Sequence, residues 1–210
     1  MRDTRVWHLS AISFTALLGM FAMVFWMPQL IKAISSQYSN TTVGLLVMIP
    51  YLVALPVMTL VGRSSDRRLE RRYHTAIPLT IGAVSLVLLG TTASSVFFSV
   101  TLWCLVASGV YSLFGPFLSL PNEFLAGFST AAGIAFINSI GNLEGFVGPY
   151  AMGVISNKTG SFRGGLVFPG ISLFISALLV LALQKRTEQQ AAGGTAMQPS
   201  PAAMPTADTD

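Results

Sequence analysis

The stretch TTVGLLVMIPYLVALPVMTLVG, Thr41–Gly62, is followed directly by RSSDRRLERRYH, Arg63–His74. The first stretch contains no charged side chain. A bilayer core about 30 Å thick requires about 20 mostly apolar residues in a helix, so this stretch predicts a transmembrane span. The second stretch carries five arginines. Arginine in a short loop favours the cytoplasmic side of a membrane.

The composition of the whole chain agrees with a membrane protein. Apolar residues make up 52% of its 210 residues and charged residues 10%, whereas soluble domains carry about 25% charged residues. Backbone groups exposed to lipid must be satisfied within the segment, which favours helices. We therefore predict an all-α integral membrane protein with six transmembrane helices over residues 8–184: His8–Ile34, Thr41–Gly62, Thr75–Thr92, Val96–Leu118, Phe128–Ile155 and Gly164–Gln184.

Two segments flank this six-helix bundle. Residues 1–7 are expected to be a cytoplasmic N-terminal segment. Residues 185–210 have little bulky apolar content and are expected to form a disordered cytoplasmic tail.

The distribution of basic residues predicts the orientation. With both termini in the cytoplasm, the inner side collects Arg2, Arg5, Arg63, Arg67, Arg68, Arg71, Arg72, Lys185 and Arg186, and the outer side only Lys32, Lys158 and Arg163. This bias predicts a multi-pass protein of the cell's inner or plasma membrane with both termini inside. It also accounts for the net charge of +4 without a nucleic-acid partner.

Three ordered motifs carry a resemblance. The loop Gly-Arg-x-Ser-Asp-Arg-Arg-x-Glu-Arg-Arg-x-His (62–74) resembles the loop between helices eight and nine of the major facilitator superfamily. Within that superfamily it is similar to the anion:cation symporter family of tartrate, phthalate, hydroxyphenylacetate and sugar-acid permeases. Arg5–Trp7 with Phe25–Lys32 resembles the seventh helix, and Pro121–Leu125 running on to Gly133–Pro149 resembles the tenth-to-eleventh helix region.

The resemblance implies that the chain is equivalent to the C-terminal half of a twelve-helix fold. Facilitator halves are parallel repeats that bind substrate between them, so an N-terminal six-helix half is the expected partner. The implied function is secondary active transport of a small organic anion, a carboxylate, coupled to protons. The alternative is an orphan or truncated fragment, or a scaffold for another membrane protein, with no transport of its own. A parallel homodimer is a further, less favoured arrangement.

The basic loop can also act as a conformational latch. Gly62 lies at a helix exit, where backbones can approach closely. Asp66 is set among Arg63, Arg67 and Arg71, and an aspartate there can cap a helix or pair with arginine across a helix contact. The simpler interpretation is a positive-inside anchor.

Two amides and one acid mark the fifth predicted span. Asn138 and Asn142 are four residues apart and share one helical face. Asn138 is roughly 15 Å from Phe128 at 1.5 Å per residue, near the middle of the bilayer. They are candidate substrate-binding residues, or polar links between helices. Glu144 lies on nearly the opposite face and is a candidate for proton coupling or a neutral structural glutamate. The family more usually has glycine at this position.

Trp26, Gln29 and Tyr111 are weaker candidates for substrate contacts. Trp26 and Gln29 lie toward the outer end of the first span, where the resemblance places the bend of the seventh helix. Trp26 also fits an interfacial belt. The chain shows no phosphate-binding loop, dinucleotide fingerprint or zinc-protease motif, and Cys104 is its single cysteine. We therefore expect no enzyme activity, no cofactor and no metal site.

Overall fold

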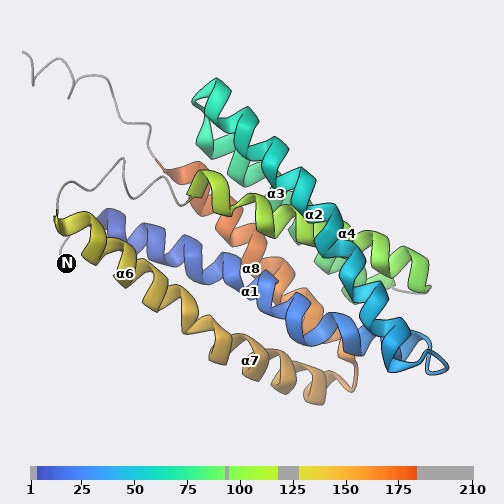
Figure 1. Ribbon diagram of the computed structural model, residues 1–210. Helices are drawn as coiled ribbons and strands as arrows, with labels where there is room; N and C mark the ends of the chain where they lie inside the picture. The colour runs from blue at the N-terminus through green and yellow to red at the C-terminus, as the bar shows by residue number, and fades with distance from the viewer. Residues whose placement is uncertain (1–3, 93–94, 118–127, 184–210) are drawn as a thin grey trace, which may run out of the picture.

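The computed structural model describes residues 4–92, 95–117 and 128–183. The helices within these ranges are α1 (Thr4–Ile34), α2 (Asn40–Arg68), α3 (Arg71–Thr92), α4 (Val96–Ser112), α6 (Phe128–Asn142), α7 (Glu144–Thr159) and α8 (Phe162–Ala182). They form an elongated bundle, shown in Figure 1. The predicted all-helical membrane fold is confirmed. The tail from residue 184 onward and the stretch 118–127 lie outside the described residues.

Five helical segments are long and apolar enough to cross a membrane: Val6–Ile34, Asn40–Arg68, Arg71–Thr92, Val96–Phe117 and Arg163–Ala182. The fifth predicted span, Phe128–Ile155, is not one continuous helix. It consists of α6 and α7, of 15 and 16 residues, which follow one another along α1 in Figure 1. Each is shorter than the approximately 20 residues that a straight span requires.

The break between α6 and α7 is a single residue, Leu143. Its amide donates to the carbonyl of Ile140 at 3.3 Å, an i to i−3 bond that tightens the turn. Pro149 follows inside α7 and has no amide hydrogen to donate to Gly145, four residues earlier. A proline combined with glycines is a recognised cause of helix kinks. The span was predicted from the length of its apolar run, and that length does not reveal a break in the helix.

The predicted loop of residues 63–74 is also largely helical. α2 continues to Arg68 and α3 begins at Arg71. The turn between them places Leu69 in the left-handed region at φ 51°. The Oε1 atom of Glu70 accepts bonds from the backbone N–H groups of Arg72 and Tyr73 at 3.2 and 3.4 Å, which caps the start of α3. Side-chain capping therefore lets both helices extend into the basic segment.

α1 lies within the bundle, with α8, α6, α7 and α4 packed around it. The hydroxyl of Ser172 donates to the backbone oxygen of Thr15 at 3.0 Å, and that of Ser176 donates to that of Ile12 at 3.0 Å. The two serines are four residues apart on one face of α8. Hydrogen bonds from small polar side chains commonly join helices in membranes, and here they tie α8 to α1.

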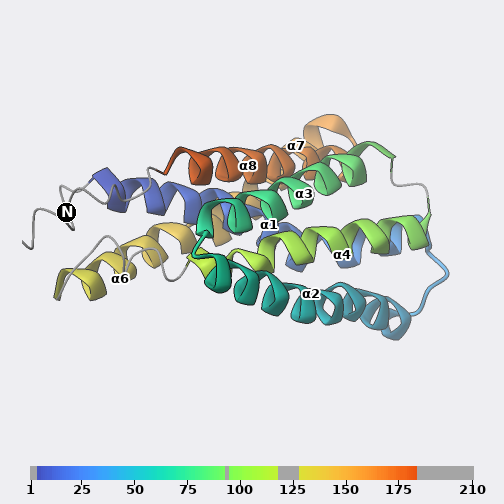
Figure 2. The same ribbon diagram turned by 90° about the horizontal axis from the view of Figure 1, so that it is seen from above.

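The remaining helices form a second group. α3 packs between α8 and α4, and α2 packs mainly on α4 at the edge of the bundle (Figure 2). α2 is the least buried of the five spans. Much of its apolar surface is therefore left for lipid or for another protein.

Two glycines of the α6–α7 pair permit close contact with α1, as their spacing predicts. A Cβ placed on Gly145 would lie 2.9 Å from Cζ of Phe21. A Cβ placed on Gly141 would collide with the hydroxyl of Ser13. Small residues four apart let membrane helices approach closely, and Gly141 and Gly145 pack against α1 in this way.

The connections alternate between the two ends of the bundle (Figure 2). The α1–α2 and α7–α8 connections lie at one end. The start of α1, the α2–α3 connection and the start of α6 lie toward the other. The five arginines between Arg63 and Arg72 therefore gather at the end opposite Lys32 and Lys158. We call these the arginine end and the lysine end.

Candidate functional site

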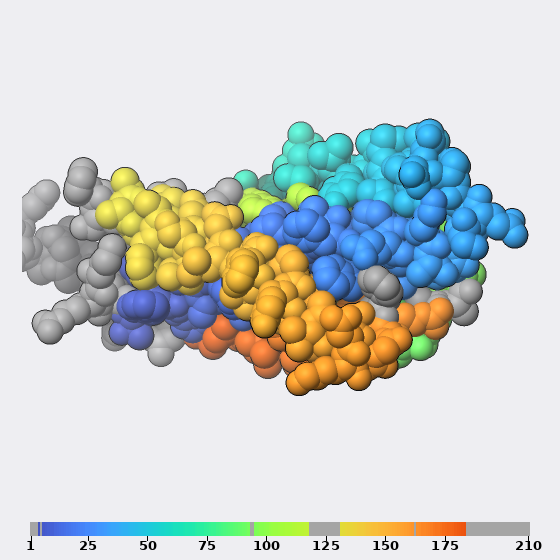
Figure 3. Space-filling model, turned by 90° about the horizontal axis from the view of Figure 1, so that it is seen from below, coloured from blue at the N-terminus to red at the C-terminus, as the bar shows by residue number. Residues whose placement is uncertain are grey.

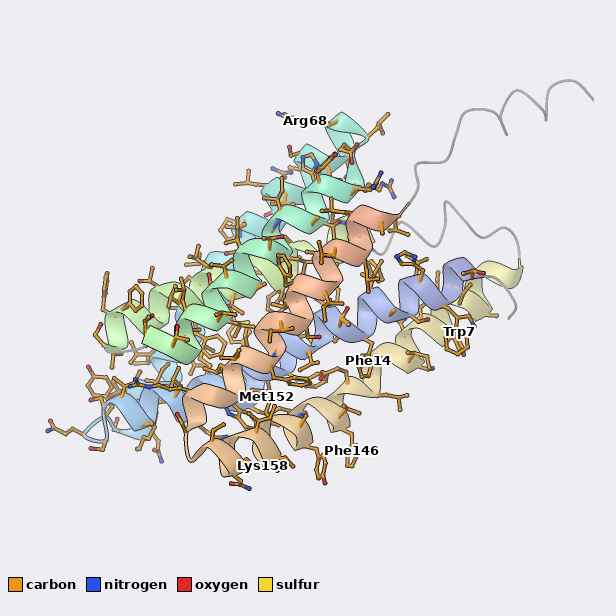
Figure 4. The ribbon with its side chains drawn as sticks, turned by 180° about the vertical axis from the view of Figure 1, so that it is seen from behind. Trp7, Phe14, Arg68, Phe146, Met152 and Lys158 are labelled. Atoms are coloured by element: carbon orange, nitrogen blue, oxygen red, sulfur yellow. The ribbon has the colours of Figure 1, made fainter. Side chains whose placement is uncertain are left out.

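One face of α6 and α7 presents a row of exposed side chains, Asn138, Asn142, Phe146 and Tyr150. Their spacing of four keeps them on one side of the helical pair. Phe146 and Tyr150 are 76% and 67% exposed, and their rings stack with centroids 6.1 Å apart. We call these four residues the α6–α7 stripe. Figure 3 shows the helices that carry it lying across α1, and Figure 4 shows Phe146 pointing away from the bundle.

The two amides of the stripe lie at mid-depth in the predicted span. Nδ2 of Asn142 donates to the backbone oxygen of Asn138 at 2.8 Å, which satisfies one amide hydrogen within the helix. Both asparagine side chains are exposed. Lipid offers no hydrogen bonds, so exposed amides at this depth require a polar neighbour.

Glu144 lies on the buried side of the same pair, as its spacing from Asn142 predicts. Its side chain is 0% exposed, and neither carboxyl oxygen has a hydrogen-bond partner among the described residues. Gly148, one turn further on, leaves it room, because a Cβ there would overlap Oε1 of Glu144. A charged residue at the centre of a span costs about 2.5–3.5 kcal/mol on insertion scales. Within the part of the chain that the structure describes, Glu144 is therefore an acid buried inside the bundle without a hydrogen-bond partner.

Trp26 and Tyr111 are not brought to the α6–α7 stripe. Trp26 is 8% exposed, and its Nε1 lies 3.4 Å from the Cβ position of Gly165 in α8, so it packs between helices. Tyr111 is half-buried and meets Tyr51 of α2 edge to face, with ring centroids 5.9 Å apart. The contact with Tyr51 was not anticipated from the sequence.

Gln29 lies elsewhere, in a pocket of about 590 Å³ between α1 and α2 at the lysine end. Lys32 and Asn40 line the same pocket. Nζ of Lys32 donates to Oδ1 of Asn40 at 2.8 Å and to the backbone oxygen of Tyr38 at 3.0 Å. The sequence alone predicts Lys32 only as a basic residue on the outer side of the membrane. Lys32 follows Gln29 by three residues and therefore shares its helical face. This spacing is the sequence feature that could have indicated a shared site.

The predicted latch residues are mostly exposed at the arginine end. Arg63, Asp66 and Arg67 are exposed. Gly62 allows a close backbone approach, since a Cβ on Gly115 would lie 3.6 Å from its Cα. Arg71 lies in the first turn of α3.

Other residues link the helices at the arginine end. Nη2 of Arg72 donates to the backbone oxygen of Leu181, and Nε2 of His8 bonds the backbone oxygen of Leu179 at 2.8 Å. Carbonyls in the last turn of a helix lack intrahelical partners, and basic side chains satisfy them well. The final turn of α8 is thus capped from α3 and α1. Only the tertiary structure reveals these contacts.

Comparison with known proteins identifies the family. The model of the Major Facilitator Superfamily matches residues 9–205. A protein of Agrobacterium vitis named as a tartrate transporter is 40% identical over 185 residues, covering 88% of this chain and 42% of that protein. The metabolite transport protein NicT of Pseudomonas putida is 38% identical over 183 residues, covering 86% of this chain and 41% of NicT. A quinolone resistance transporter of Acinetobacter baumannii is 33% identical over 190 residues, covering 90% of this chain and 43% of that transporter.

This chain spans about two-fifths of the length of these curated relatives. No solved structure matches it. The resemblance carried by the 62–74 segment and the two other motifs is confirmed by the family match and by the names of the relatives. With its apolar spanning helices, the chain is a multi-pass membrane protein of a transporter family rather than an enzyme. It belongs to the Major Facilitator Superfamily.

Proposed function

We propose that this chain forms the second six-span half of a secondary transporter that moves a small organic carboxylate together with protons. The observation that carries the proposal is the α6–α7 stripe, whose amides at Asn138 and Asn142 are exposed at mid-depth. Exposed amides in a span are tolerated where they face a water-filled cavity or a protein partner, because either can supply hydrogen bonds. Facilitator halves bind substrate at the interface of two parallel repeats, so the stripe would line that interface.

The carboxylate class rests on the named relatives. The Agrobacterium vitis relative is named for tartrate, which is a small dicarboxylate. Amide N–H groups donate to carboxylates, and the aromatic rings of Phe146 and Tyr150 would bound the cavity beside them. We place Trp26, Gln29 and Tyr111 in supporting roles, because none of them is on the stripe. Gln29 would act at the lysine end and Tyr111 on α4.

We further propose that Glu144 takes part in proton coupling. Its carboxyl group is buried and unpartnered, and it lies one helical turn beyond Ile140, next to the break at Leu143. A change in α6–α7 geometry at this break would expose the carboxyl group to the cavity and allow proton exchange. An intramembrane acid is a functional candidate in transporters.

At the arginine end, we propose that Gly62, Arg63, Asp66, Arg67 and Arg71 form a conformational latch with the N-terminal half. The exposed charges of Arg63, Asp66 and Arg67 leave them accessible to such a partner. We assign this end to the cytoplasm of a cell with the protein in its inner membrane, since arginine-rich short loops remain inside.

The test is uptake of radiolabelled tartrate into proteoliposomes. Two proteins are compared, this chain alone and this chain fused behind the first half of the Agrobacterium vitis relative. We expect uptake only from the fusion, stimulated by an inward proton gradient. If a monodisperse, membrane-inserted fusion shows no uptake of tartrate or other small carboxylates, the chain is better described as a membrane fragment or scaffold.

A further inference from the structure

The pocket at the lysine end has features that its role in connecting α1 to α2 does not require. Its volume of about 590 Å³ is within the range of about 300–1,000 Å³ for small-molecule sites. Val43 and Val47 of α2 and Pro28 of α1 form apolar walls. Polar groups come from Gln29 and Lys32 on α1 and Asn40 at the start of α2. Apolar walls with a few convergent polar groups are typical of ligand pockets.

The polar groups of this pocket are held in place and retain free donors. Lys32 uses two of its three ammonium hydrogens, on Tyr38 and Asn40. Because Oδ1 of Asn40 accepts from Lys32, its amide nitrogen remains a donor. Nε2 of Gln29 donates to the backbone oxygen of Phe25 at 2.8 Å, which leaves a second amide hydrogen. One ammonium and two amides therefore offer donors from fixed positions.

The charge at this pocket is not neutralised. No acidic side chain among the described residues lines it, and Lys158 and Arg163 add positive charge at the same end of the bundle. A compact ammonium binds a carboxylate through strong charge-assisted hydrogen bonds. The apolar walls favour a ligand with a hydrocarbon or aromatic part next to its carboxylate.

We propose that this pocket is a second anion site, which binds the carboxylate of a small amphipathic organic acid at Lys32, Asn40 and Gln29. The proposal extends the proposed transport function, because the same ligand class would reach the pocket before it reaches the α6–α7 stripe. The competing explanation is structural: Lys32 only anchors the α1–α2 connection through Tyr38 and Asn40. Occupancy of the pocket by a ligand separates the two explanations.

The test uses the 210-residue chain in lipid nanodiscs and benzoate as the probe. Lysines are acylated with a water-soluble active ester, and the rate at each lysine is measured by mass spectrometry. Lys158 is exposed at the same end and is the internal reference. We expect benzoate at about ten times its dissociation constant to slow acylation of Lys32 about tenfold, by mass action. Lys158 should be unaffected, and neutral benzamide should protect neither.

A pocket-filling variant provides the second measurement. Gly44 borders the pocket, and a Cβ there would meet no atom within 4 Å. Gly44→Leu should therefore fold, occupy the pocket and abolish the protection of Lys32 by benzoate. Gln29→Ala should weaken the protection without removing it. Equal protection of Lys32 and Lys158, no protection of Lys32, or protection that survives Gly44→Leu would each overturn the proposal.

The two proposals can fail separately. If benzoate protects Lys32 but the fusion takes up no carboxylate, the anion site is supported and the transport function is rejected. If the fusion takes up carboxylate but benzoate does not protect Lys32, the transport function is supported and the anion site is rejected.

Discussion

Gly109 of α4 and Gly82 of α3 pack backbone against backbone. A Cβ placed on Gly109 would lie 3.1 Å from both Cα and N of Gly82, and it would collide with the backbone oxygen of Pro78. Backbone atoms cannot move aside as a flexible side chain can. The approach of α3 to α4 therefore depends on the absence of a side chain at Gly109.

We predict that Gly109→Ala destabilises the bundle by about 1–3 kcal/mol, the usual cost of overpacking. The melting temperature in detergent, followed by size-exclusion chromatography, should fall. Gly153→Ala is the matched control, because a Cβ there would meet nothing within 4 Å. The control should leave stability unchanged or raise it by up to about 1 kcal/mol. Equal melting temperatures for the two variants would contradict the packing described above.

Arg72 should contribute to stability through the last turn of α8. Arg72→Ala removes its bond to the backbone oxygen of Leu181, and bonds from charged groups contribute about 1.5–3 kcal/mol. Arg68→Ala is the control, because Arg68 is exposed at the end of α2 (Figure 4). Its effect should be within about 0.5 kcal/mol. Comparable thermal shifts for both variants would show that the α3–α8 contact does not stabilise the bundle.

Asn142→Ala in the fusion protein should impair carboxylate uptake while leaving the protein in the membrane. Loss of a hydrogen bond to a charged substrate costs about 1.5–3 kcal/mol, so KM should rise roughly tenfold to a hundredfold. Ser139→Ala is the matched control on the same helix, because its exposed hydroxyl bonds its own backbone at Ala135. Unchanged uptake kinetics in Asn142→Ala would remove this residue from the substrate site.

Glu144→Gln should separate proton coupling from substrate movement. Glutamine has nearly the same volume, so it should fit beside Gly148, but it cannot take up or release a proton. We expect proton-driven accumulation of tartrate to be lost while tartrate exchange between preloaded vesicles continues. Retention of both activities would leave Glu144 as a structural residue, and loss of both would indicate damage to the fold.

Patterns in the sequence predicted the parts of this protein that depend on local properties. A span is recognised by its apolar length, as in Thr41–Gly62, because the bilayer imposes that length on each helix separately. The opposite placement of Asn142 and Glu144 follows from helical geometry alone. The contact of Gly145 with a neighbouring helix follows from the preference of membrane helices for small residues where they meet.

Other features depend on which helices meet, and only the tertiary structure decided them. Trp26 is buried because Gly165 of α8 packs beside it. The side chain of Arg72 donates to the backbone oxygen of Leu181, which is more than a hundred residues away in the sequence. Lys32 becomes part of a pocket only when α2 folds back and brings Asn40 to it. Hydropathy and residue spacing are properties of a single helix. These contacts join different helices, and the sequence of one helix does not specify which other helix packs against it.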